Sequence, residues 1–203
     1  MSCCINNRER IKTLIHFSCI LLFFFYWHEQ GADLFLTNVY QHYDIVIWSQ
    51  TSLRWLEIKL QELGFLRPDR PYKFLFVLTK ECMFRLQQRD SRGKIKKKAC
   101  KPLQLIWTKF PQYDAKNSVH LDDLATNFCL NPKNGLKCSG FYRTKSGARD
   151  DCELLLWAKY MELLWEGWEK RGEDVRTRDH SNWLSILQQV GSESGSSGAT
   201  KTT

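Results

Sequence analysis

The chain has 203 residues, of which 43% are hydrophobic and 26% are charged, and its formal net charge at pH 7 is +8. These values are ordinary for a globular protein and exclude the disordered and fibrous classes. The length predicts one compact domain with appendages rather than two full domains.

Much of the positive charge lies in residues 89–101, which include Arg92, Lys94, Lys96, Lys97, Lys98 and Lys101. Such a stretch is a solvated lysine-rich hairpin or loop, or a surface for nuclear targeting, an acidic partner or nucleic acid. No aromatic residues alternate with these lysines, so stacking of single strands is not indicated. We therefore expect no direct binding of nucleic acid.

Eight cysteines are scattered along the chain, without a C-x-x-C pair or a neighbouring histidine at zinc-ligand spacing. A zinc site is therefore not expected. In a chain of this length the cysteines are expected to be free and mostly buried thiols in a reducing compartment.

The most apolar run, residues 14–27, follows three basic residues, Arg8, Arg10 and Lys12. It is shorter than the roughly 20 residues that span a bilayer as a helix, so stable membrane insertion is not expected. A secretion signal or anchor, a buried strand, and the aberrant start of a truncated product are the three interpretations, and we favour the last two. Within the run, residues 20–26 suit a strand buried on both faces.

Clear strand and helix patterns follow. The β-branched run at residues 44–48 (DIVIW) predicts a strand that ends in four polar residues. Leucines at helical spacing predict a helix over residues 53–63, and Gly64 fits its left-handed exit. Residues 72–78 (YKFLFVL) predict a second strand, and the basic stretch after it predicts a hairpin.

The second half of the chain continues this alternation. Residues 118–121 predict a third strand, and residues 131–135 (NPKNG) predict a turn. The amphipathic residues 151–168 predict a long helix, and a short helix is expected around residues 183–187. Residues 191–203, rich in serine, glycine and threonine, are predicted to form a disordered tail.

Polar side chains stand where the predicted strands end, namely Ser49, Lys101, Asp122 and Asp123. Ligands of open parallel sheets bind beyond the carboxyl ends of the strands. A hydroxyl and a lysine can hold phosphate oxygens, and paired acids can hold Mg²⁺, as metal-assisted phosphoryl transfer requires. Each also has a structural interpretation: Ser49 as a turn residue, Lys101 as one of many lysines, and the acids as a cap for a helix at Leu124.

Three segments carry a resemblance to a known family: YDIVIWSQTSLRWLEIKLQELG, KPLQLIWTKF and HLDDLATNFCLNPKNGLK. In this order they resemble the ubiquitin-like-domain-containing CTD phosphatases, a branch of the haloacid dehalogenase superfamily, over residues 28–190. The resemblance implies an α/β fold with a doubly wound parallel sheet and a β-hairpin insertion. It also implies a Mg²⁺-dependent protein serine/threonine phosphatase that forms an aspartyl-phosphate.

The resemblance also implies partners and residue roles. Known members are nuclear and act on the RNA polymerase II tail or the proteasome, so the nucleus and a phosphoserine or phosphothreonine protein are the expectations. By position, Ser49 and Lys101 would bind phosphate, and Asp122 and Asp123 would bind the metal.

The sequence departs from the family at its first strand. Members open with D-x-D-x-T/V, in which the first aspartate is the nucleophile and the second the acid/base, whereas this chain has FSCILLFFFYW and no D-x-D anywhere. The predicted Mg²⁺ site is therefore incomplete, and activity is expected to be very low or absent. We expect residues 20–26 to occupy the central position that the missing or substituted strand leaves.

The predicted organisation is an atypical hydrophobic segment at residues 1–27, a partial catalytic domain at 28–190 and the tail. The chain has no room for a ubiquitin-like domain, so an amino-terminally truncated product is expected. Besides an inactive phosphatase, two functions compete. One is a non-catalytic module that binds phosphoproteins or an acidic partner through Ser49, Lys101, Asp123 and the lysine hairpin. The other is a membrane protein anchored by residues 14–27, with acylation at Cys3 or Cys4.

Overall fold

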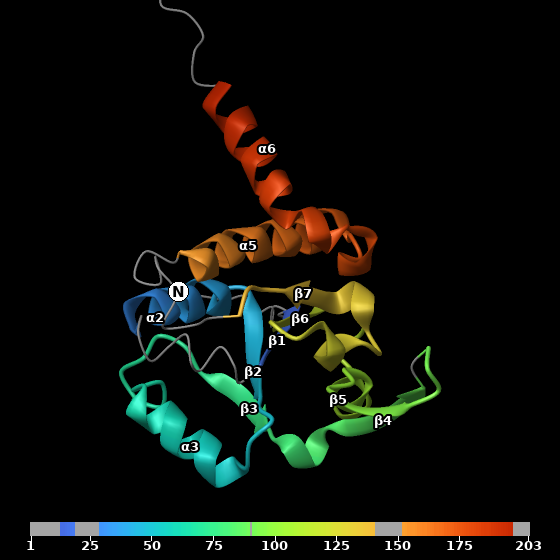
Figure 1. Cartoon of the computed structure of the whole chain (residues 1–203). Coiled ribbons are helices and arrows are strands. Elements are labelled where there is room, and N and C mark those ends of the chain that lie inside the picture. The colour runs from blue at the N-terminus through green and yellow to red at the C-terminus, as the bar shows by residue number, and fades with distance from the viewer. Residues whose placement is uncertain (1–12, 19–28, 90, 141–151, 197–203) are drawn as a thin grey trace, which may run out of the picture.

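The computed structural model describes residues 13–18, 29–89, 91–140 and 152–196. Five parallel strands form one sheet in the order β3-β2-β1-β6-β7 (Figure 1). They are β1 (Thr13–Ser18), β2 (Tyr43–Trp48), β3 (Phe74–Leu78), β6 (Ser118–Asp122) and β7 (Gly135–Lys137). The prediction of an α/β protein with a parallel sheet is confirmed.

Helices connect the strands, as parallel pairing requires. The α-helices are α2 (Glu29–Tyr40), α3 (Leu53–Glu62), α4 (Gln104–Lys109), α5 (Glu153–Arg171) and α6 (Trp183–Ser196). Short 3-10 helices lie at η1 (Lys80–Cys82), η2 (Ala125–Phe128), η3 (Pro132–Asn134), η5 (Val175–Thr177) and η6 (His180–Asn182). The helix α2 had no predicted counterpart, although its buried residues Ala32, Phe35, Leu36 and Val39 recur at helical spacing.

The two faces of the sheet are covered by different helices because side chains alternate along each strand. On one face, Ile15, Ile45 and Ile47 belong to a large buried cluster with side chains of α2, α3 and α5. On the other face, Leu14, Val46 and Trp48 pack with Leu103 and Ile106 in a smaller cluster around α4. Figure 1 shows α2 and α5 side by side over the first face.

The central strand differs from the prediction. Residues 20–26 were expected there, but β1 is formed by Thr13–Ser18, which pair with β2 on one side and with β6 on the other. The long apolar run offers no polar boundary from which its register could be read, so the strand was placed several residues too late. Residues 20–26 lie outside the described part of the chain.

Two further predictions concern the ends of the chain. Residues 14–18 of the proposed anchor are strand residues at the middle of the sheet. Of the helices that the structure describes, none is long and apolar enough to cross a membrane. At the other end, α6 continues to Ser196, six residues into the segment predicted to be a tail, and residues 197–203 lie outside the described part.

The basic stretch forms the predicted hairpin. Strands β4 (Phe84–Arg89) and β5 (Ile95–Cys100) pair antiparallel in a separate two-stranded sheet. The hairpin projects from the body away from α2 and α5 (Figure 1). Its second strand ends at Cys100, so the hairpin leads directly into Lys101.

The edge strand β7 depends on a residue without a side chain. Gly135 lies against the ring of Phe128, and a Cβ atom on Gly135 would overlap that ring. We expect Gly135→Ala to lower the free energy of unfolding by about 1 to 3 kcal/mol, because the buried ring has to move. Urea denaturation measures this loss. The control Gly191→Ala, in α6 with no atom near its added Cβ, should be neutral or mildly stabilising, and equal losses in both variants would contradict the packing argument.

Candidate functional site

The carboxyl edge of the sheet holds a buried ion pair. The ammonium Nζ of Lys101 lies 2.9 Å from Oδ2 of Asp122, and both side chains are fully buried. Lys101 follows β5 and Asp122 ends β6, so residues 21 positions apart in the chain meet at one strand end. Two of the residues that the sequence singled out are therefore direct partners.

Other donors complete the surroundings of Asp122. Asn127 donates from Nδ2 to both carboxylate oxygens at 2.9 and 2.8 Å, and the backbone N–H of Leu124 donates to Oδ1 at 2.8 Å. Burial opposes ionisation of this carboxyl, but the hydrogen bond from His120 and the charge of Lys101 hold its pKa below the ordinary value. Hydrogen bonds from the protein thus replace the water that would otherwise hydrate the Asp122 carboxylate.

Asn127 joins three segments of the site. Its side-chain oxygen accepts from Nε2 of Gln50 at 3.0 Å, its amide nitrogen donates to Asp122, and its backbone carbonyl accepts from the N–H of Lys101 at 2.7 Å. The turn after β2, the exit of the hairpin and the loop after β6 are therefore fixed to one buried amide. Sequence reasoning missed Asn127, since nothing in the spacing of its segment marks it.

His120 lies on the same face of β6 as Asp122, two residues away. Its Nε2 is 3.2 Å from Oδ2 of Asp122, and the imidazole is fully buried. Burial lowers the pKa of His120 to about 4, although the hydrogen bond and the charge of Asp122 act in the opposite direction. The imidazole is therefore neutral near pH 7, and with the proton on Nε2 it donates to the carboxylate. The two-residue period of a strand could have linked His120 to Asp122.

Ser49 follows β2 at the same edge. Its Oγ accepts from the backbone N–H of Thr51 at 2.9 Å and lies 2.6 Å from Oγ1 of Thr51. These contacts are those expected of a serine that stabilises a turn, the structural alternative for Ser49. Through its neighbour Gln50, this turn is tied to Asn127 and hence to Asp122. Ser49 therefore belongs to the same edge, while its predicted contact with phosphate stays a prediction.

Asp123 differs from its neighbour. It is half-buried, and its Oδ1 is buried without a hydrogen-bond partner among the described residues. Burial and the adjacent charge of Asp122 raise the pKa of Asp123 above its ordinary value. Two neighbouring acids thus have opposite environments, one fully engaged and the other with a free acceptor atom.

The end of β1 lies between these groups. Ser18 is in register with Trp48, the residue before Ser49, and Phe17 is in register with Leu121, the residue before Asp122. The strand reads TLIHFS and contains no acidic residue. Strand β1 therefore brings no carboxylate of its own to this edge of the sheet.

Magnesium does not fit these residues as they are arranged. Mg²⁺ takes oxygen ligands in octahedral geometry and is usually held by one or two carboxylates with waters and substrate phosphates. Both oxygens of Asp122 are engaged, which leaves Asp123 as the only carboxylate of the pair with an acceptor to offer, and a single carboxylate is a sparse ligand set. In the described ranges no group of three or more histidine, cysteine, aspartate or glutamate side chains is placed to hold a metal ion.

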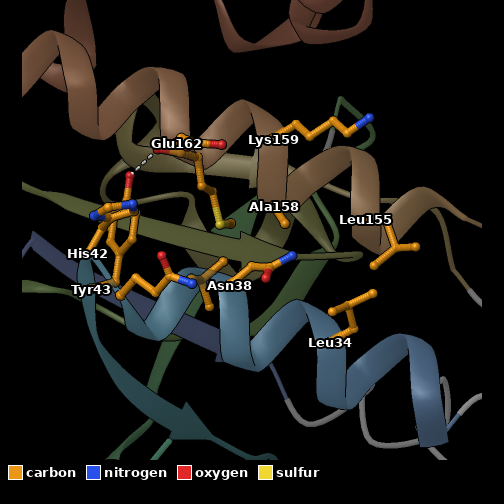
Figure 2. A pocket seen from close by; sticks show the side chains of 11 residues that line it. Leu34, Asn38, His42, Tyr43, Leu155, Ala158, Lys159 and Glu162 are labelled. Atoms are coloured by element: carbon orange, nitrogen blue, oxygen red, sulfur yellow. Dashed lines mark hydrogen bonds between the residues drawn. The ribbon is translucent and has the colours of Figure 1, made fainter. Parts of the chain in front are cut away.

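A pocket elsewhere in the molecule is unrelated to this edge. A pocket of about 380 Å³ lies between α2 and α5. Leu34, His42, Ala158 and Glu162 are among the residues that line it (Figure 2). It adjoins Tyr43, the first residue of β2, whose hydroxyl donates to the carbonyl of Met161 at 2.7 Å. The pocket therefore lies at the amino end of β2, opposite to Ser49, and contains none of the predicted site residues.

Comparison with known proteins assigns the fold and the edge to a family. The family model described as NLI interacting factor-like phosphatase matches residues 12–176. The chain belongs to this phosphatase family. The match includes β1, β2, β3, the hairpin and the acid pair, so the resemblance inferred from the three segments is confirmed, as is the haloacid-dehalogenase-like fold class.

Curated relatives carry a more specific name. "Ubiquitin-like domain-containing CTD phosphatase 1" of Homo sapiens is 40% identical over 165 residues, which are 81% of this chain and 47% of that protein. The Arabidopsis thaliana "Ubiquitin-like domain-containing CTD phosphatase" is 38% identical over 164 residues, which are 80% of this chain and 44% of that protein. The chain thus spans less than half the length of these relatives.

Among solved structures, the fission yeast RNA polymerase II CTD phosphatase Fcp1, with bound beryllium fluoride, is 13% identical with a TM-score of 0.41. The match covers 91% of this chain and 57% of the Fcp1 chain. A similarity of this size adds nothing to the family assignment, which rests on the family model and the relatives.

The buried ion pair makes a quantitative prediction. Lys101→Met or Asp122→Asn alone should lower the free energy of unfolding by about 3 to 5 kcal/mol, because each leaves its partner buried without a counter-charge. The double variant should lose clearly less than the sum of the two. Urea denaturation of the four proteins gives the coupling energy.

The exposed pair Arg67 and Asp69, whose side chains are 62% and 64% exposed, provides the matched control. Arg67→Met with Asp69→Asn should show a much smaller coupling, because solvent screens the two exposed charges. A coupling between Lys101 and Asp122 as small as that of the control would contradict their role as a mutually dependent pair.

Proposed function

We propose that this chain is a phosphatase-type domain that recognises phosphorylated serine or threonine segments and does not turn them over. One observation carries the proposal. The sheet edge keeps Lys101 and Asp122 in a complete hydrogen-bonded assembly, while the central strand TLIHFS brings no carboxylate to that edge.

The missing carboxylate decides the chemistry. Covalent phosphoryl transfer to an enzyme requires an acceptor atom placed in line with the leaving oxygen. Electrostatic stabilisation by Lys101 and hydrogen bonds from the turn at Ser49 can position a phosphate, but they cannot replace the acceptor. A site that positions the phosphate but has no atom to accept the phosphoryl group binds its ligand without turning it over.

The retained groups suit phosphate recognition of modest strength. Ser49 has its hydroxyl at the strand end, where it is buried and accepts from the N–H of Thr51, and the chain has an excess of eight positive charges. The charge of Lys101 is already compensated by Asp122, so a single phosphate gains less from it than from an uncompensated lysine. Affinity for one phosphate group at this edge should therefore be weak.

Partner and location are proposals for this chain that follow from the family. Members of the family generally depend on Mg²⁺, but the acid pair of this chain does not fit the ion as arranged, so we propose no metal step for it. The relatives are named as CTD phosphatases, and we propose a phosphoserine or phosphothreonine protein such as the RNA polymerase II tail or the proteasome as partner, with a nuclear location favoured by the basic hairpin.

The proposal is tested by turnover. The purified chain should release no phosphate above the buffer rate from a small aryl phosphate or from a phosphoserine peptide, with or without Mg²⁺, because strand β1 brings no nucleophilic carboxylate to the edge. Asp123→Ala is the control for metal-dependent activity. Phosphate release that Asp123→Ala abolishes would mean that another residue supplies the nucleophile, and the proposal would be wrong.

A further inference from the structure

We propose that one face of the β4–β5 hairpin binds a segment carrying two phosphoserines, through Arg85, Arg89 and Lys97. This inference deepens the proposed function and rests on it for the phosphoprotein nature of the partner. It adds a second site, outside the sheet edge, and a spacing that the partner's phosphates must have.

The register of the hairpin places these three cations together. Gln87 is opposite Lys97, Arg85 is opposite Ala99, and Arg89 is opposite Ile95. Because directly paired residues and residues two apart share a face, Arg85, Lys97 and Arg89 form a triangle on one side of the hairpin. Lys97 lies diagonally next to each arginine. All three residues are exposed.

Among the described residues, no acid forms an ion pair with the triangle. Arg85 and Lys97 take part in no ion pair among the described residues, and the guanidinium of Arg89 donates only to the carbonyl of Gly93, at 3.5 Å. Like charges on neighbouring strand positions destabilise a hairpin. Residues 84–100 contain seven basic residues and one acid, Asp90. A bound polyanion would relieve this repulsion.

The dimensions select the ligand. Arg85 and Arg89 are four residues apart on one strand, which separates them by roughly 13 Å. An extended peptide with two phosphoserines four residues apart spans the same distance on one side of its backbone. Each phosphate then meets one arginine, which can hold it with two parallel hydrogen bonds, and Lys97 adds charge between them.

The position of the hairpin connects this face to the sheet edge. Strand β5 ends at Cys100, and the next residue is Lys101, whose backbone is fixed to Asn127. A segment held on the hairpin is thereby kept close to the edge that binds a single phosphate weakly. Linked weak contacts reinforce one another through effective concentration.

A peptide fits this face better than a nucleic acid does. Recognition of single strands combines basic side chains with aromatic rings on which bases stack. The triangle contains no aromatic residue, and its neighbours on the same face are Gln87, Ala99 and Ile95. Charge without stacking surfaces suits phosphate groups carried by a peptide.

The experiment measures affinity for a fluorescent peptide with two phosphoserines four residues apart, by anisotropy in EDTA, so that any turnover cannot alter the probe. The variant Arg85→Gln/Arg89→Gln/Lys97→Gln should weaken binding roughly tenfold, as expected for the loss of three exposed charge contacts. Its affinity should also depend less on salt. For a peptide with one phosphoserine, the same triple substitution should weaken binding at most twofold.

The matched control is Arg54→Gln/Lys73→Gln/Lys159→Gln, which removes three exposed cations elsewhere and changes the net charge equally. It should keep the affinity of the parent chain. Equal losses in both variants, or none in the hairpin variant, would overturn the proposal, as would a single-stranded RNA of equal charge that binds more tightly and displaces the peptide.

Failure of the proposed function is separable from failure of this inference. If the chain hydrolyses the peptide in Mg²⁺ while the hairpin variant still binds it tenfold more weakly in EDTA, the hairpin binding site is supported and the proposed absence of turnover is wrong. Urea denaturation should show that the hairpin variant is at least as stable as the parent, since its like-charge repulsion is removed.

Discussion

The buried ion pair between Lys101 and Asp122 is the constraint on which the edge of the sheet depends. Placing both charges out of water is costly, and it is offset only because His120, Asn127 and Leu124 donate further hydrogen bonds to the carboxylate. These donors come from β6 and the loop after it, and Asn127 extends the connection to the turn at Gln50. The geometry of the site is therefore held by its own hydrogen bonds, with no need for a ligand.

The position of the side chains at this edge and the presence of a nucleophile are separate properties of the structure. The family assignment and the parallel sheet explain why Ser49, Lys101 and the acid pair converge. Strand β1 completes the sheet and satisfies the backbone groups of its two neighbours, but it supplies no acidic side chain. A strand buried on both faces can therefore complete the centre of the sheet whether or not it carries an acidic side chain.

The sequence predicted the parts of the fold that short, bounded patterns encode. Residues 44–48 and 118–121 became β2 and β6 because polar residues mark their ends, and the tryptophan-rich helix became α5 because its apolar residues repeat at helical spacing. Strand β1 was misplaced because its apolar run has no boundary. Asn127 was missed because its importance arises from contacts across the sheet edge, which local spacing does not contain, whereas the two-residue period of β6 could have linked His120 to Asp122.

The most direct test of the central claim is ³¹P NMR of a phosphoserine peptide mixed with an equal amount of the chain in Mg²⁺. It reports binding and turnover in one sample. The account predicts that the phosphoserine resonance shifts or broadens as the peptide binds, and that no resonance of inorganic phosphate grows over hours. An inorganic phosphate signal that appears with the parent chain and not with Asp123→Ala would contradict the absence of turnover. A phosphoserine resonance unaffected by the protein would contradict the recognition of phosphoserine.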